Sequence, residues 1–113
     1  MKPGEIVLAH FPLGGTGGRK LRPTLVLSGP LGSVPEYVVA YISSVIPPIL
    51  EPTDLVMDPK APGFSSTKLK VRSVVRAHKL ATIHGTDVIR RLGIVSPTFF
   101  LEVQARLRIV LGL

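Results

Sequence analysis

The stretch that decides the fold of this chain is residues 4–28, GEIVLAHFPLGGTGGRKLRPTLVLS. Residues 4–9 and 22–28 predict two buried strands, because β-branched and leucine side chains dominate both segments. Residues 12–21 between them form a basic loop that contains four glycines. Two strands joined this closely predict an antiparallel pair, because no helix fits between them.

Two further strands follow. Residues 36–43, EYVVAYIS, predict a third strand, which begins after the turn-rich segment GPLGSVP at residues 29–35. Residues 45–67 hold five of the eleven prolines, and proline is confined to sheet edges and loops. This segment is therefore interpreted as a long excursion with one short edge strand, Asp54–Met57.

Residues 67–83 are the longest strand candidate. Neighbouring strand residues point to opposite faces, so alternation places four cations and one histidine on one sheet face. These are Lys68, Lys70, Arg72, Arg76 and His78. The alternation changes phase near Lys79, which predicts a bulge or a break there.

Two helices are predicted after the last strand. Residues 86–92 indicate a short helix, with Thr86 as its N-cap and Gly93 as its stop. Ser96 then caps a longer helix with Pro97 at its first position, where proline is tolerated. Its apolar stripe should face the sheet and consists of Phe100, Val103, Leu107 and Val110. At 113 residues, the chain is expected to form one mainly β (α+β) domain, residues 1–113.

The charge balance favours a polyanionic partner. Fourteen Lys and Arg against seven Asp and Glu give a net charge of +7, and no acidic residue lies between Asp58 and Asp87. Nucleic acid or an acidic protein segment would suit such a chain. The absence of cysteine excludes a disulfide framework and a zinc ribbon. No apolar run approaches the roughly 20 residues that span a membrane, and no signal-peptide core follows Met1, so we expect a cytoplasmic protein.

The chemistry-bearing residues narrow the kind of reaction. His10, His78 and His84 show no metal-ligand spacing, and GTGG lacks the ending of a phosphate-binding Walker loop. RNA can instead be cleaved through its own 2′-hydroxyl, which needs cationic donors at the phosphorus and polar groups that handle two protons. The sequence offers these types at four positions: Arg22, Ser43, Arg76 and His78.

The order of segments resembles the MazF/PemK family of toxins from type II toxin–antitoxin systems. The segments are GEIVLAHFP, a glycine-rich loop, RPTLVLS, VVAYISS, SVVRAHKLATI and IRRLGIVS. The resemblance implies an SH3-like, CcdB/PemK-type small barrel with a C-terminal helix, usually a homodimer. It implies a growth-regulating, sequence-specific endoribonuclease that cuts single-stranded RNA, often mRNA, without metal or cofactor. It also implies a cognate antitoxin whose acidic or amphipathic tail occupies the RNA groove, and DNA binding together with that antitoxin.

The same resemblance assigns roles to residues. Arg22 and Ser43 match the core of the family's site, and because Ser44 follows directly, either serine can supply the hydroxyl. Arg76 and His78 match an Arg-x-Asp pair that acts as acid and base in the PemK branch, with histidine in place of the carboxylate. The expected RNA-binding residues are Arg19, Lys20, Ser44, Lys68, Lys70 and Arg72. The expected gate for substrate and antitoxin is Gly14, Gly15, Thr16, Gly17 and Gly18.

Two other interpretations of the chain stay open. The first is a catalytically weak homologue that still binds RNA or antitoxin, which is suggested by histidine at position 78. The second is a purely structural SH3-like interaction domain, which the one-sided basic strand disfavours.

Overall fold

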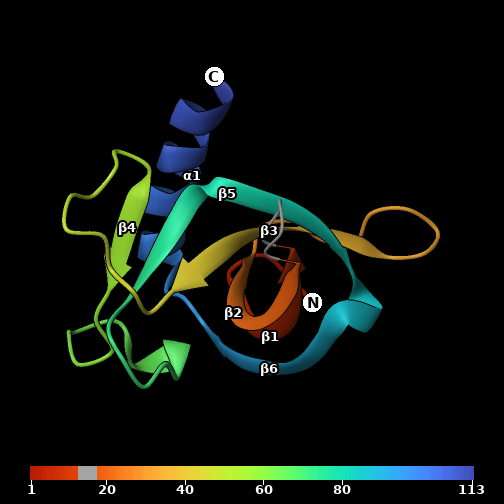
Figure 1. Ribbon diagram of the computed structural model, residues 1–113, viewed down its shortest axis with the longest axis horizontal. Helices are drawn as coiled ribbons and strands as arrows, with labels where there is room; N and C mark the ends of the chain where they lie inside the picture. Colours follow the sequence, from red (N-terminus) through yellow and green to blue (C-terminus); the bar gives the residue numbers. More distant parts are fainter. Residues whose placement is uncertain (13–17) are drawn as a thin grey trace.

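The structure is a computed structural model in which residues 1–12 and 18–113 are described (Figure 1). The elements of the described residues are β1 (Glu5–Pro12), β2 (Arg19–Val26), β3 (Glu36–Ser43), β4 (Asp54–Met57), the 3-10 helix η1 (Ser65–Thr67), β5 (Ser73–His84), the 3-10 helix η2 (Gly85–Asp87), β6 (Val88–Ile94) and α1 (Pro97–Leu111). The strands form one antiparallel sheet in the order β4-β5-β3-β2-β1-β6. The mainly β class with a C-terminal helix is confirmed.

The sheet curls without closing. Figure 1 shows β5 and β6 passing on opposite sides of the β1–β2 hairpin, with α1 behind β5. Within the described residues, the edge strands β4 and β6 do not pair with each other. The small antiparallel barrel that the resemblance implied is therefore present as a curled sheet that stays open between β4 and β6.

The segment η1 lies against β6, the strand at one edge of the sheet. The Ser66 hydroxyl donates a hydrogen bond of 2.8 Å to the Ile94 carbonyl oxygen. A Cβ on Gly93 would lie 2.5 Å from the Ser66 carbonyl oxygen and closer still to that of Thr67, so only glycine fits there. Close backbone approach is a common reason for glycine inside a strand. This contact holds the segment that follows η1 near the sheet.

The third and fourth strands are confirmed at the predicted bounds, and β4 is an edge strand as expected. The β1–β2 hairpin is also confirmed, but its pairing runs further than predicted, from Ile6–Leu25 to Pro12–Arg19. Buried Phe11 extends the core to the end of β1, which explains the longer strand. Of the predicted gate, residues 14–17 lie outside the described residues, and Gly18 has a positive φ of 64°.

The predicted strand at 67–83 begins only at Ser73, so its first third is wrong. Thr67 closes η1, and its hydroxyl donates to the Phe64 carbonyl oxygen (2.8 Å) and accepts from the Leu69 amide (3.3 Å). Such local side-chain bonds compete with a strand ladder. Lys68 then adopts a left-handed conformation with φ 58°. Consequently Lys68, Lys70 and Arg72 precede β5 and do not share its face with Arg76.

The irregularity predicted near Lys79 is confirmed. Pairing of β5 with β3 passes from Ala40–Leu80 directly to Tyr41–Arg76, so residues 77–79 bulge out of the ladder. A bulge re-aims the side chains that it carries.

The short helix predicted at 86–92 is wrong. The 3-10 helix η2 covers only Gly85–Asp87, and the following residues form β6, which pairs with β1. β2 pairs with only one edge of β1, so the other edge offers backbone hydrogen-bond partners to residues 88–94. Pairing with that edge outweighs the local helical pattern.

The C-terminal helix is confirmed with its caps, since the Ser96 hydroxyl accepts from the Phe99 amide (3.1 Å) and Pro97 stands in the first turn. Its stripe is rotated slightly, because Phe99 and Val103 are its buried residues while Phe100 and Leu107 are partly buried. No helix in the described ranges is long and apolar enough to cross a membrane.

Candidate nucleic-acid interface

A cavity of about 590 Å³ lies between the sheet and the chain segment that leads into β5. Part of its lining is a row across three neighbouring strands. Leu8 of β1 pairs with Pro23 of β2 on one side and with Arg90 of β6 on the other. Ile42 of β3, Leu69 and Leu92 add further apolar surface. The cavity therefore has an extended apolar lining, and Arg90 lies at the β6 end of the row formed by Pro23, Leu8 and Arg90.

Cations dominate the polar part of the cavity lining. The polar residues are Arg22, Ser44, Lys68, Lys70, Ser73 and Arg90. No acidic side chain belongs to the lining that the described residues provide. Clefts lined by one sign of charge focus the field and attract counter-ions, so this cavity suits an anion.

Arg22 stands at the start of the buried part of β2 and borders this cavity. Its backbone is held by Thr24, a fully buried residue whose hydroxyl donates to the Arg22 carbonyl oxygen at 3.1 Å. The Nε atom of Arg22 is buried and has no hydrogen-bond partner among the described residues. An unpaired buried donor costs free energy, and an anionic ligand would satisfy it.

The two serines at the end of β3 occupy different positions. The pairing of β2 with β3 ends at Thr24 and Tyr41, so Arg22 and Ser43 lie beyond the shared ladder, each two residues from that last pair. The Ser43 hydroxyl donates to the Val45 carbonyl oxygen and accepts from the Val45 amide, each at 3.1 Å. Ser44 is exposed and borders the cavity. Ser44 therefore borders the cavity, whereas Ser43 does not belong to its described lining.

Arg76 is engaged in a structural ion pair. Its Nε and a terminal nitrogen lie 3.0 Å and 3.4 Å from the two carboxylate oxygens of Asp54. The Asp54 side chain is wholly buried, whereas Arg76 keeps 20% of its side chain exposed. Asp54 also accepts from the Glu51 amide at 2.9 Å. Arg76 thus joins β4 to β5 and does not line the cavity.

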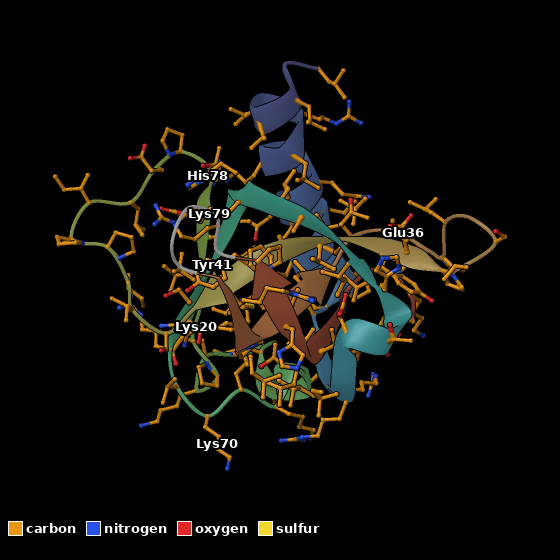
Figure 2. The ribbon with its side chains drawn as sticks, turned by 45° about the vertical axis from the view of Figure 1, so that its right-hand side comes forward. Lys20, Glu36, Tyr41, Lys70, His78 and Lys79 are labelled. Carbon is orange, nitrogen blue, oxygen red and sulfur yellow. The ribbon has the colours of Figure 1, made fainter. Side chains whose placement is uncertain are left out.

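His78 lies in the β5 bulge and is also outside the cavity lining. Its Nδ1 and the Thr53 hydroxyl share a hydrogen bond of 2.7 Å. Lys79 stands 5.5 Å from the centre of the Tyr41 ring, a cation–π arrangement. Figure 2 shows His78 and Lys79 on the same side of the molecule and Lys70 far from them, at the lower end of the view.

Only some of the predicted RNA-binding residues line the cavity. Lys68 and Lys70 line the cavity together with Ser44, whereas exposed Arg72 and Lys20 do not. Arg19 forms a 2.7 Å ion pair with Asp87, and this hydrogen-bonded guanidinium holds the pKa of the Asp87 carboxyl below its usual value. Arg19 therefore helps to hold β2 against η2.

Sequence reasoning missed two polar residues of the cavity, Arg90 and Ser73. Arg90 fell in the segment interpreted as a helix, and Ser73 in the middle of the overlong strand. Residues 88–92, two apolar residues, two arginines and a leucine, show no apolar–polar alternation that would identify a strand. The signal that would place Arg90 is its pairing with Leu8, which is a tertiary contact.

Comparison with known proteins gives one family and one fold. The family model for the PemK-like, MazF-like toxin of type II toxin-antitoxin systems matches residues 2–111. No curated protein sequence matches the chain.

Several solved structures share the fold. MazF from Deinococcus radiodurans is 21% identical, with a TM-score of 0.74, and the match covers 100% of this chain and 97% of that one. An endoribonuclease from a mycobacterial species, solved with its cognate antitoxin, is 20% identical, with a TM-score of 0.73 and coverage of 100% and 96%. Mycobacterium tuberculosis toxin MazF-mt6 is 20% identical, with a TM-score of 0.72 and coverage of 96% and 97%. At these identities the likeness establishes the fold.

Proposed function

Because this chain belongs to the PemK-like, MazF-like toxin family of type II toxin–antitoxin systems, we propose that it is an endoribonuclease. Its substrate is single-stranded RNA, such as mRNA, cut at specific sequences without a metal ion. The observation that carries the proposal is the buried Nε of Arg22, which has no hydrogen-bond partner among the described residues, in a residue that borders a cavity lined by cations. Solved structures of similar fold that are described as endoribonucleases support it.

The reaction is an attack within the substrate. The 2′-oxygen of one nucleotide bonds to the adjacent phosphorus, and the bond from phosphorus to the 5′-oxygen breaks. The 2′-hydroxyl loses its proton, and the leaving 5′-oxygen gains one. The products are a 2′,3′-cyclic phosphate and a 5′-hydroxyl. Arg22 stabilises the charge that develops on the phosphoryl oxygens, where positioned donors have their largest effect. Ser43, the last residue of β3, holds the scissile phosphate.

The remaining residues have supporting roles in this proposal. Ser44, Lys68 and Lys70 bind the RNA beside the cut, with the lysines on phosphates. His78 lies outside the described cavity lining and hydrogen-bonds to Thr53, so in this proposal it is a positioning residue and does not act on the reacting atoms. Arg76 is a positioning residue, because its guanidinium is committed to buried Asp54.

The decisive experiment compares three proteins on labelled single-stranded RNA in EDTA. The parent should cleave and Arg22→Ala should not, while Arg108→Ala should cleave like the parent, since Arg108 lies in the last turn of α1. Retention of RNA without cleavage by the parent would favour the catalytically weak binding homologue. The log affinity should then fall by roughly 0.7 per log unit of salt for each phosphate neutralised. Neither binding nor cleavage would leave a structural interaction domain.

We also propose that the protein works in the cytoplasm as a homodimer and that a cognate antitoxin inhibits it. Structures of similar fold include an endoribonuclease with its antitoxin and a MazE–MazF complex. A net charge of +7 and a cavity lining without acids suit an acidic antitoxin tail. DNA binding would belong to the toxin–antitoxin complex. Light scattering tests the dimer, which should weigh twice the 12.1 kDa chain.

A further inference from the structure

The cavity presents hydrogen-bond donors in excess. Three basic residues of its described lining, Lys68, Lys70 and Arg90, have side chains that can donate hydrogen bonds but cannot accept them. Ser44 and Ser73 provide the only side-chain acceptors in the described lining, and Ser73 is 3% exposed. A ligand group that brings its own donors would compete with this lining. A ligand edge made of acceptors would match it.

The apolar part of the cavity suits a flat ring. Leu8, Pro23 and Ile42 lie on three consecutive neighbours in the sheet, with Leu92 beside them on β6. A volume of about 590 Å³ is within the range of cavities that hold small molecules. Arg90 pairs with Leu8, so a charged donor stands next to this apolar row. A ring that packs on the row would place its edge near Arg90.

Lys68 gives independent support for an anionic ligand at the cavity. Its φ of 58° is left-handed, a conformation that glycine adopts freely and other residues adopt at a cost. Its amide donates to the Ser65 carbonyl oxygen at 3.3 Å, which stabilises the turn without needing a lysine side chain. A lysine at this strained position supplies a charge to the lining.

We propose that this cavity takes one base of the RNA and selects keto bases, uracil or guanine, over the amino bases cytosine and adenine. The inference rests on the proposed ribonuclease function. It adds to that function the class of base that is selected and the residue, Arg90, that selects it. Guanine presents O6 and N7 as acceptors and uracil presents O4, whereas adenine and cytosine present an exocyclic amino donor at the same place. Arg90 reads that edge, and Lys68 and Lys70 hold the flanking phosphates.

The test uses pairs of bases that differ only at this edge. Short oligonucleotides with 2′-deoxy sugars, which cannot be cleaved through a 2′-hydroxyl, would carry uracil or cytosine, and in a second pair hypoxanthine or adenine. Fluorescence anisotropy at one fixed salt concentration gives each Kd. The parent should bind the keto member of each pair about 5- to 150-fold more tightly, the range for one well-placed reading contact.

Variants test the role of Arg90. Arg90→Gln should reduce the preference to less than about twofold, because glutamine offers one acceptor and one donor group. Arg108→Gln removes the same charge from the far end of α1 and should keep the preference. Arg90→Lys retains a donor and should keep part of it. Arg90 is exposed, so these variants should fold, and circular dichroism checks that they do.

The other possible results contradict either the base-selecting cavity or the proposed ribonuclease function. Equal affinities within both pairs, or a preference that persists in Arg90→Gln, would refute base selection by this cavity. RNA cleavage by the parent alongside equal affinities would reject the inference and leave the proposed function intact. A keto preference without any RNA cleavage would reject the enzyme and keep the base site. Absence of binding to every one of these oligonucleotides would reject the base site, and absence of RNA cleavage by the parent as well would reject both.

Discussion

The Asp54–Arg76 ion pair makes a prediction that separates structure from catalysis. In Arg76→Ala the Asp54 carboxylate stays wholly buried and keeps only the Glu51 amide as a donor. Breaking a buried ion pair by removing one partner costs about 3–5 kcal/mol, and the 20% exposure of Arg76 favours the lower end. We therefore expect a loss of about 3 kcal/mol in the free energy of unfolding.

Urea denaturation followed by circular dichroism measures this loss. With an m value of about 2 kcal/mol/M for a small protein, the midpoint should fall by about 1.5 M. The variant that carries both Asp54→Ala and Arg76→Ala should recover part of the stability, because no unpaired charge remains buried. Lys79→Ala is the matched control: it removes a nearby cation that faces the Tyr41 ring, and should cost no more than about 1 kcal/mol. An unchanged midpoint in Arg76→Ala together with lost RNA cleavage would refute the structural role and make Arg76 catalytic.

Three further predictions concern β6, the serine and acid stability. Gly93→Ala should destabilise the fold by about 1–3 kcal/mol, because its Cβ meets the backbone of η1, whereas Gly29→Ala, with open space around it, should not; equal urea midpoints would contradict this. Ser43→Ala should lower the cleavage rate about 10- to 150-fold, the worth of a hydrogen bond to a charged group, and Ser43→Thr should restore it; a rate like the parent's would move the role to Ser44. The pKa of Asp87 is lowered by its bond to Arg19, so its contribution to stability is present above the ordinary value of 3.8 and lost as the pH falls through the lowered folded value. Acid titration of the unfolding free energy should therefore be flatter in Asp87→Asn, and identical curves would contradict that role.

The sequence predicted the secondary structure correctly where neighbouring side chains alone determine whether a segment is a strand or a helix. The strands at 36–43 and 54–57 and the cap at Ser96 were predictable from alternation, proline placement and capping chemistry. The bulge at 77–79 was also visible, as a change of phase. These features depend on short-range sequence alone.

The errors arose where distant residues decide. Residues 88–94 form a strand because the free edge of β1 pairs with them, and that pairing brings Arg90 to the cavity. The hydrogen bond from Arg76 to Asp54, 22 positions earlier, is likewise a contact that alternation along the strand does not predict. Thr67 is held out of the strand by a local contact, the hydrogen bond from its hydroxyl to the Phe64 carbonyl oxygen. Alternation of apolar and polar residues does not reveal such a bond, so the sequence pattern places Thr67 in the strand.

We propose that this protein cleaves RNA through the substrate's own 2′-hydroxyl, with Arg22 at the reacting phosphate. The most direct measurement maps the cut that the parent makes in EDTA, then replaces the single 2′-hydroxyl beside the scissile phosphate with hydrogen. We expect a 2′,3′-cyclic phosphate on the product of the original RNA and no cut at that position in the substituted RNA. Cleavage that persists at the substituted position would contradict it.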